Sequence, residues 1–388
     1  MKKHMKKILG KERGITLIAL VITIIVLLIL AGVSIAMLTG QNGILTQAQN
    51  AKNKTEEAQT DEESKLESYE QYIKGSTNGG TLITVTGNET TNTTVYDSLG
   101  NKIVVPAGFK VINPGDNVED GIIIEDVSYG ATAGSQFVWI PVGDNIKKKD
   151  GTTFNIKLSR YMFDDENGIA TDKGNENIAG AQELNTGTVN ITAKEDIESE
   201  DAGFRKSAIE NGGYYIGRYE ARTSTSRTSK EDPLTQLTIK PSDYVYRYVK
   251  QPQAANLSRD MYADNTNFTS DLTNSYAWDT AIVFLQECDD REGENNKIYS
   301  IQNSLNTGSI ANKGTNETDT KDLICNISDM ASNCFEWSTE TYKYNNTDWV
   351  NRGGYYHTNY YAASRNHYFD QESASYMDAS FRVLLYIK

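Results

Sequence analysis

The sequence predicts an α+β protein in which one long N-terminal helix precedes a domain of short strands, few helices and long loops. Three observations support this prediction. An uncharged apolar run covers Ile15–Leu38 near the start of the chain, and a polar stretch with mostly helical spacing follows it. Short β-branched and aromatic runs then alternate with Gly, Asn and Ser turns. The 388 residues are enough for such a helix and one sizeable globular domain, or two smaller ones.

The first 38 residues have the charge pattern of a membrane anchor. Residues 1–14 hold six Lys or Arg and one Glu, and the run Ile15–Leu38 holds no charge. At about 1.5 Å per residue, that run is long enough to cross a hydrocarbon layer of about 30 Å. Basic residues on its near side predict a cytoplasmic N-terminus. A secretory signal peptide would have a shorter apolar core, and a plain signal anchor is the alternative.

The junction between these segments, KERG followed by ITLIALV, resembles the type IV prepilin family. In that family a dedicated peptidase cuts after a Gly on the cytoplasmic side of the apolar helix, and the new N-terminus is methylated. The resemblance implies that Gly14 ends a leader and Ile15 begins the mature chain, with prepilin peptidase and other pilin-like subunits as partners. Pilins usually carry Glu at the fifth mature position, where it partners the N-terminal amine of a neighbouring subunit. This chain has Ala19 there, which favours a minor or tip subunit.

After the span, apolar positions continue at mostly helical spacing among Glu and Lys as far as Ile73. We therefore expect one pilin-like helix over residues 15–74, although a solvated charged stalk would have the same pattern. GSTNGG at Gly75–Gly80 predicts the end of that helix and a flexible joint. Residues 75–120 predict a linker with a small lead-in unit of short strands, and residues 121–388 predict the main domain.

Composition indicates the kind of partner. The chain has 23 Tyr against 10 Phe, which favours amphipathic surfaces. Its formal charge is −14, and residues 15–388 carry −19 because the leader holds six of the 38 basic residues and one of the 52 acidic ones. An acidic ectodomain argues against nucleic acid as a partner, since phosphate binding needs a basic surface.

The three cysteines, Cys288, Cys325 and Cys334, are too few for a disulfide framework. We expect small buried thiols, with a Cys325–Cys334 bridge as the alternative.

The main domain has six ordered segments that predict strands, an amphipathic helix and tight Gly turns. They are GSQFVWIPVG (Gly134–Gly143), GGYYIGRYEAR (Gly212–Arg222), SYAWDTAIVFLQE (Ser275–Glu287), NISDMASNCFEWSTETY (Asn326–Tyr342), RGGYY (Arg352–Tyr356) and FRVLLYI (Phe381–Ile387). In the third segment, the core face of a helix is predicted for Trp278, Ala281, Ile282 and Leu285. Structural roles are expected for Arg352, Gly353, Gly354, Phe381 and Arg382, and core or groove-wall positions for Trp337 and Trp349.

In that order, the segments from Gly121 to Lys388 resemble the formylglycine-generating enzyme family, a branch of the C-type lectin fold. DMASNCFEW stands where the family has an Asp-Met-Ala-Gly-Asn run that ends in Glu-Trp. The resemblance implies a C-type lectin-like domain. The family's sulfatase-activating enzymes use two cysteines near the C-terminus to bind copper, and this chain has none between Arg352 and Phe381. We therefore expect no enzyme and no required cofactor, with a cysteine-independent relative of that family as the alternative.

Residues 355–380 contain six Tyr, two His, two Asn, two Asp and four Ser, which is not the composition of a core strand. The segment resembles the variable segment of proteins diversified by diversity-generating retroelements, in which adenine changes in Asn codons yield Tyr, His, Asp and Ser. That resemblance implies these variable, ligand-binding candidates: Tyr355, His357, Asn359, Tyr360, Tyr361, Asn366, His367, Tyr368, Asp370, Tyr376 and Asp378. An ordinary polar surface is the plain alternative, and a metal site on His357 and His367 is a weaker one. A structural calcium ion could also be held by Asp and Asn side chains between Asn326 and Glu336.

Together these features predict a single-pass membrane protein with an extracellular C-terminal domain. We expect a minor or tip pilin-like adhesin whose lectin-like face binds a protein or glycan target. Tyr provides rigid contact area, and Ser and Asn provide adaptable hydrogen bonds. Antibody binding loops are enriched in the same residue types. A tethered structural protein that never enters a filament is the remaining alternative.

Overall fold

The computed structural model describes residues 21–29, 52, 55, 83–127, 129–174, 176, 178, 181–183, 203–288, 300, 322–342, 345–356, 361–367 and 378–388. The chain forms two compact units, Met1–Glu70 and Gln71–Lys388. In the first unit, residues 21–29 are helical with exposed side chains. No helix among the described residues is long and apolar enough to cross a membrane. Gly14, Ile15 and most of the helix expected over residues 15–74 lie outside the described residues.

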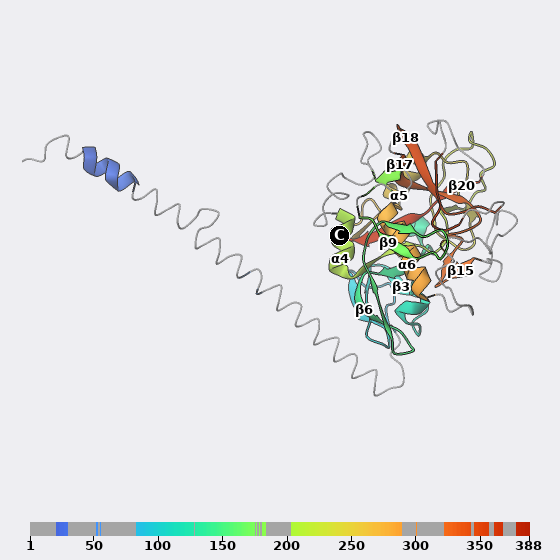
Figure 1. The fold of residues 1–388 in the computed structure, drawn as a ribbon, viewed down its shortest axis with the longest axis horizontal. Coiled ribbons are helices and arrows are strands. Elements are labelled where there is room, and N and C mark those ends of the chain that lie inside the picture. Colours follow the sequence, from blue (N-terminus) through green and yellow to red (C-terminus); the bar gives the residue numbers. More distant parts are fainter. Residues whose placement is uncertain are drawn as a thin grey trace, which may run out of the picture. The chain divides into compact units, whose positions relative to one another are not determined.

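The second unit mixes helices with many short strands, which confirms the predicted α+β class (Figure 1). Its helices are α4 (Gly203–Asn211), α5 (Gln251–Asp260) and α6 (Ser275–Cys288), with the short 3-10 turns η1 (Val118–Asp120) and η2 (Gly130–Thr132). Its strands up to residue 183 are β1 (Thr93–Tyr96), β2 (Lys102–Val105), β3 (Phe109–Val111), β4 (Ile123–Asp126), β5 (Gln136–Pro141), β6 (Gly143–Lys147), β7 (Thr153–Ile156), β8 (Tyr161–Phe163), β9 (Ala170–Asp172) and β10 (Ala181–Glu183). The later strands are β11 (Gly213–Gly217), β12 (Arg222–Thr223), β13 (Tyr244–Val245), β14 (Phe268–Leu272), β15 (Leu323–Ile324), β16 (Ile327–Ser328), β17 (Phe335–Tyr342), β18 (Asn345–Arg352), β19 (Arg365–His367), β20 (Ala379–Phe381) and β21 (Val383–Ile387).

A six-stranded antiparallel sheet in the order β14-β21-β11-β5-β4-β3 forms the centre of this unit. Every residue of β5 is buried, because both faces of the sheet are covered. The two end strands of this sheet contact each other through side chains, since the rings of Phe109 in β3 and Phe268 in β14 lie 5.4 Å apart. The division expected at residue 121 falls between β3 and β4, which pair within this one sheet.

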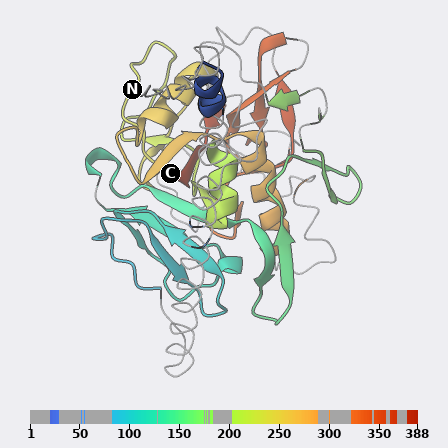
Figure 2. The same ribbon diagram turned by 90° about the vertical axis from the view of Figure 1, so that its left-hand side faces the viewer.

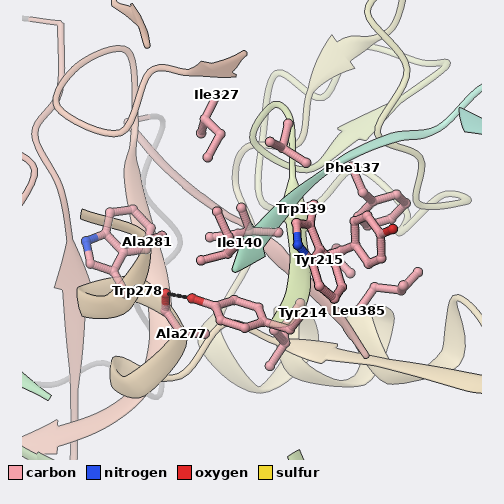
Figure 3. Packing of buried hydrophobic residues seen from close by; sticks show 14 of the residues in the cluster. Phe137, Trp139, Ile140, Tyr214, Tyr215, Ala277, Trp278, Ala281, Ile327 and Leu385 are labelled. Atoms are coloured by element: carbon pink, nitrogen blue, oxygen red, sulfur yellow. Dashed lines mark hydrogen bonds between the residues drawn. The ribbon is translucent and has the colours of Figure 1, made fainter. Parts of the chain in front are cut away.

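The helix predicted from periodicity is α6, which packs against this sheet. Its N-terminus is capped because the Asn274 side chain accepts a hydrogen bond from the Ala277 backbone N–H at 2.9 Å. The four residues predicted as its core face are all buried, which confirms that prediction. Figure 3 shows Tyr214 from β11 reaching α6, where its hydroxyl donates a hydrogen bond to the Ala277 carbonyl at 2.5 Å.

A second sheet runs in the order β10-β17-β18-β19, and β20 pairs in parallel with β17. In Figures 1 and 2, β17 and β18 lie at the end of the unit opposite the early strands β1–β3. Helix α6 contacts β5 of the central sheet and β17 of the second sheet, so it joins the two sheets. Trp337 and Trp349 on these strands are buried, as predicted.

Gly353 follows β18 with a φ of 76°, a backbone conformation that favours glycine. A Cβ at this position would lie 2.5 Å from the Met330 carbonyl oxygen. The expected structural role of this glycine is therefore confirmed.

Candidate functional site

A buried network of charged side chains holds β18 and β19 against α6. Arg352 on β18 donates one hydrogen bond to Glu340 at 2.8 Å and another to Asp279 of α6 at 2.5 Å. Arg365 on β19 bonds the same two carboxylates, through Nε to Glu340 at 2.9 Å and through Nη2 to Asp279. Arg160, just before β8, donates to Glu340 at 2.9 Å. Three guanidinium groups thus share two carboxylates in the interior.

The electrostatics of Glu340 follow from this arrangement. Burial by itself would raise its pKa, but the positive charges of Arg365, Arg352 and Arg160 outweigh burial and lower the pKa. Glu340 is therefore ionised, and its two oxygens pair with all three guanidinium groups. The network restricts the position of β19 because each side chain is held by several partners.

A second buried pair, Arg382 and Glu336, joins the chain near its C-terminus to β17. Arg382 donates to Glu336 of β17 at 2.9 Å and also to the carbonyls of Gly217 and Ser328. Burial raises the pKa of Glu336 to about 8, and the charge of Arg382 offsets this only in part. The expected structural role of Arg382 is confirmed.

Beside the first network lies a cavity of about 630 Å³, which we call the β8–β19 cavity. From β8 and the turn after it, the lining includes Met162, Phe163, Asp164 and Asp165, and Ile178 lies farther along the chain. From the C-terminal segment, the lining includes Tyr361, Ala363, Ser364, Arg365 and Asn366. Two of the candidate residues, Tyr361 and Asn366, are therefore brought together.

Tyr361 and Asn366 differ in their surroundings. The Tyr361 backbone N–H donates to the Ser364 hydroxyl at 3.0 Å, which fixes the turn before β19. Burial raises the pKa of the Tyr361 hydroxyl, and the nearby Asp165 carboxylate adds to the rise. The Nδ2 atom of Asn366 is buried, and within the described part of the chain it has no hydrogen-bond partner. The same is true of both amide atoms of Asn351, which is opposite Asn366 in the β18–β19 register.

Other candidate residues lie elsewhere or outside the described residues. Tyr355 packs on Phe335 with ring centroids 4.6 Å apart, and the Asp378 backbone carbonyl accepts the Phe335 N–H at 2.9 Å. Neither lines the β8–β19 cavity. Only the backbone of His367 is described, as part of β19. The remaining candidates, His357, Asn359, Tyr360, Tyr368, Asp370 and Tyr376, lie outside the described residues.

The cysteines are all free thiols, so the alternative Cys325–Cys334 bridge is not formed. Cys334 is buried, as expected, but the expectation of buried thiols is wrong for Cys288 and Cys325, which are half-buried. The thiol groups of Cys288 and Cys325 share a hydrogen bond. Among the described residues, no group of three or more His, Cys, Asp or Glu side chains could hold a metal ion.

Sequence reasoning missed the β8 side of the cavity and both carboxylates of the network. Asp279 carries the one signal that could have revealed the network, since a carboxylate beside Trp278 on a largely buried helix requires a cationic partner. Met162, exposed on β8 of the second unit, gives no comparable pattern in the sequence.

Comparison of the chain with protein-family models, curated proteins and solved structures gives no match.

Proposed function

We propose that this protein is a minor or tip-located pilin-like subunit that displays a C-type lectin-like, ligand-binding domain outside the cell. The observation that carries the proposal is the β8–β19 cavity, where Tyr361 and Asn366 from the Tyr-rich segment line one concave site. Concave sites with apolar walls and a few polar groups are the usual form of ligand sites. Membrane attachment is supported by the basic leader and the uncharged run that begins at Ile15.

The lectin-like part of the proposal is supported by where the resemblance segments lie. Three of them form β5, β11 and β21, which are neighbours in the central sheet, and a fourth forms α6 against it. The RGG segment supplies Arg352, which ties β18 to α6. A rigid scaffold of this kind limits the entropy lost when loops on its surface bind a target.

The binding proposal is tested with the full chain in detergent micelles on glycan and peptide arrays. We expect a defined set of ligands whose binding is lost in Tyr361→Ala. The matched control is Tyr96→Ala, because Tyr96 is also half-buried and lies on β1, outside the cavity. Array binding that is equal in the two variants, or absent from the unmodified chain, would contradict the proposal.

The anchor is tested by mass spectrometry of the protein recovered from its native membrane. A mature N-terminus at a methylated Ile15 is expected, whereas a chain that still begins at Met1 would favour a tethered protein outside any filament.

Retroelement diversification predicts a near copy of the codons for Arg352–Lys388, with Asn codons at the candidate positions, beside a reverse-transcriptase gene. If the neighbouring DNA lacks such a copy, this part of the proposal is wrong. Oxidation of a thiol peptide by the purified chain would instead favour the enzymatic alternative.

A further inference from the structure

The rim of the β8–β19 cavity carries two exposed carboxylates, Asp164 and Asp165. Asp164 accepts backbone N–H groups of Glu166 and Asn167, both at 3.0 Å, which orient it within the turn after β8. Across the described ranges, no Lys or Arg pairs with either carboxylate. Among the side chains that the structure describes, none therefore compensates the negative charge of this rim.

Aromatic rings line the same cavity as these carboxylates. Tyr361 and Phe163 both contribute to the wall. A cation gains both from a carboxylate and from an aromatic ring, and the gain increases where water is partly excluded. A neutral sugar could use the rings, but it would leave the two rim charges uncompensated. Charge complementarity therefore favours a Lys or Arg side chain as the group that enters here.

The floor of the cavity, unlike its acidic rim, carries hydrogen-bond donors and is complemented by an acceptor. The buried Nδ2 atom of Asn366 is a donor without an acceptor among the described residues. The Ser364 hydroxyl accepts the Tyr361 N–H and keeps its own hydrogen for donation. Arg365 also lines the floor, with its guanidinium held by Glu340 and Asp279. A carbonyl oxygen fits this donor-rich floor better than a second cation would.

The strand that forms this floor is also an edge strand among the described strands. β19 is the last strand of its sheet in the part of the chain that the structure describes, and it pairs with β18 through Arg352–Arg365 and Asn351–Asn366. In an antiparallel edge strand, alternate residues point their N–H and C=O groups away from the sheet. An extended peptide can add to such an edge through its own backbone.

We propose that the β8–β19 cavity binds an extended peptide segment of a protein target. The peptide backbone pairs along β19 and offers a carbonyl to Asn366, and one Lys or Arg side chain lies between Tyr361 and the rim carboxylates. This inference rests on the proposed ligand-binding function and names the class of ligand. It rests on the cavity, the uncompensated rim charge, the unpartnered donor and the edge strand together.

The test uses fluorescein-labelled heptapeptides of one Ser/Thr/Val sequence that differ only in a central Lys, Arg, norleucine or Glu. Binding to the full chain in detergent micelles is measured by fluorescence anisotropy. Because a charge-assisted contact is replaced by an apolar one, the Lys and Arg peptides should bind at least about tenfold more tightly than the norleucine peptide. The Glu peptide should bind most weakly, and added salt should weaken only the Lys and Arg peptides.

Substitutions in the protein distinguish the contact with the Lys or Arg side chain from the contact with the peptide backbone. Asp165→Asn should reduce Lys-peptide binding by about tenfold without affecting the norleucine peptide. Asp144→Asn is the matched control, because Asp144 is also exposed but lies on β6 outside the cavity. Asn366→Ala should weaken the Lys and norleucine peptides alike, since it removes a contact to the backbone.

Equal binding of the Lys and norleucine peptides, or equal effects of Asp165→Asn and Asp144→Asn, would overturn the inference. If a neutral oligosaccharide binds in a Tyr361-dependent way while no peptide does, this inference fails and the proposed function stands. If neither oligosaccharide nor peptide shows Tyr361-dependent binding, both fail.

Discussion

Replacing Glu340 by Gln removes one of the two carboxylates that neutralise three buried guanidinium groups. The side chain of Glu340 is fully buried, and it pairs with Arg160 and Arg365 at 2.9 Å and with Arg352 at 2.8 Å. Loss of one partner from a buried ion pair typically costs about 3–5 kcal/mol, because the remaining charge stays in the interior uncompensated. We expect the free energy of unfolding to fall by about 4 kcal/mol, within the range of about 5–15 kcal/mol that domains have available.

The assay is urea unfolding of the full chain in detergent micelles, followed by tryptophan fluorescence. The control is Glu210→Gln, which breaks an ion pair of 3.7 Å with Lys206 between side chains that are 60% and 50% exposed. Since exposed helix pairs contribute about 0.3–0.5 kcal/mol, the control should change little.

The pH dependence gives an independent check with a defined sign. The folded-state pKa of Glu340 is lowered, so its contribution to stability is present above its ordinary value of 4.5 and is lost as the pH falls below it. The difference in stability between the wild-type chain and Glu340→Gln should therefore be constant near neutral pH and shrink in acid. If Glu340→Gln lowers the free energy of unfolding by less than about 1 kcal/mol, no more than the loss of an exposed pair, the reasoning is refuted.

Three further predictions concern other parts of the second unit. Gly353→Ala should lower the free energy of unfolding by about 2 kcal/mol or more, because the new Cβ would lie 2.5 Å from the Met330 carbonyl oxygen; an unchanged urea midpoint would contradict this. Burial raises the folded-state pKa of Glu336 to about 8, so its contribution is present below pH 4.5 and is lost as the pH rises through 8. Glu336→Gln should reduce the fall of the urea unfolding midpoint with rising pH. If the midpoint of the variant falls with pH as steeply as that of the wild-type chain, this prediction is wrong. Treatment with glutathione disulfide should join Cys288 to Cys325, whose thiols are in contact, and peptide mapping that finds the third cysteine in the bridge would disagree.

The helix α6 was predictable because its signal is local. The spacing of Trp278, Ala281, Ile282 and Leu285 records one buried face, and the structure buries all four. The acidic residue beside Trp278 was not assigned a role, because its partners Arg352 and Arg365 lie far along the chain. Neither the periodicity of α6 nor its composition identifies those partners.

The cavity was half predictable. The Tyr-rich composition singled out Tyr361 and Asn366, and both line it. The same reasoning also chose Tyr355, whose ring packs on Phe335 instead. Composition identifies which residue types suit binding, but it does not say which of them face a common space. The β8 wall, with Asp164 and Asp165, comes from a segment that the sequence did not associate with the C-terminal segment at all.

By itself, the sequence determined the α+β class, the buried positions of Trp278, Trp337 and Trp349, and the need for glycine at Gly353. These properties depend on hydrophobic periodicity and on steric limits within a few residues. Only the tertiary structure decided that β8 and β19 form one cavity and that Glu340 and Asp279 share three arginines. Those pairings depend on how distant strands and α6 pack together, because the cost of burying a charge is met only when its partner lies within hydrogen-bond distance.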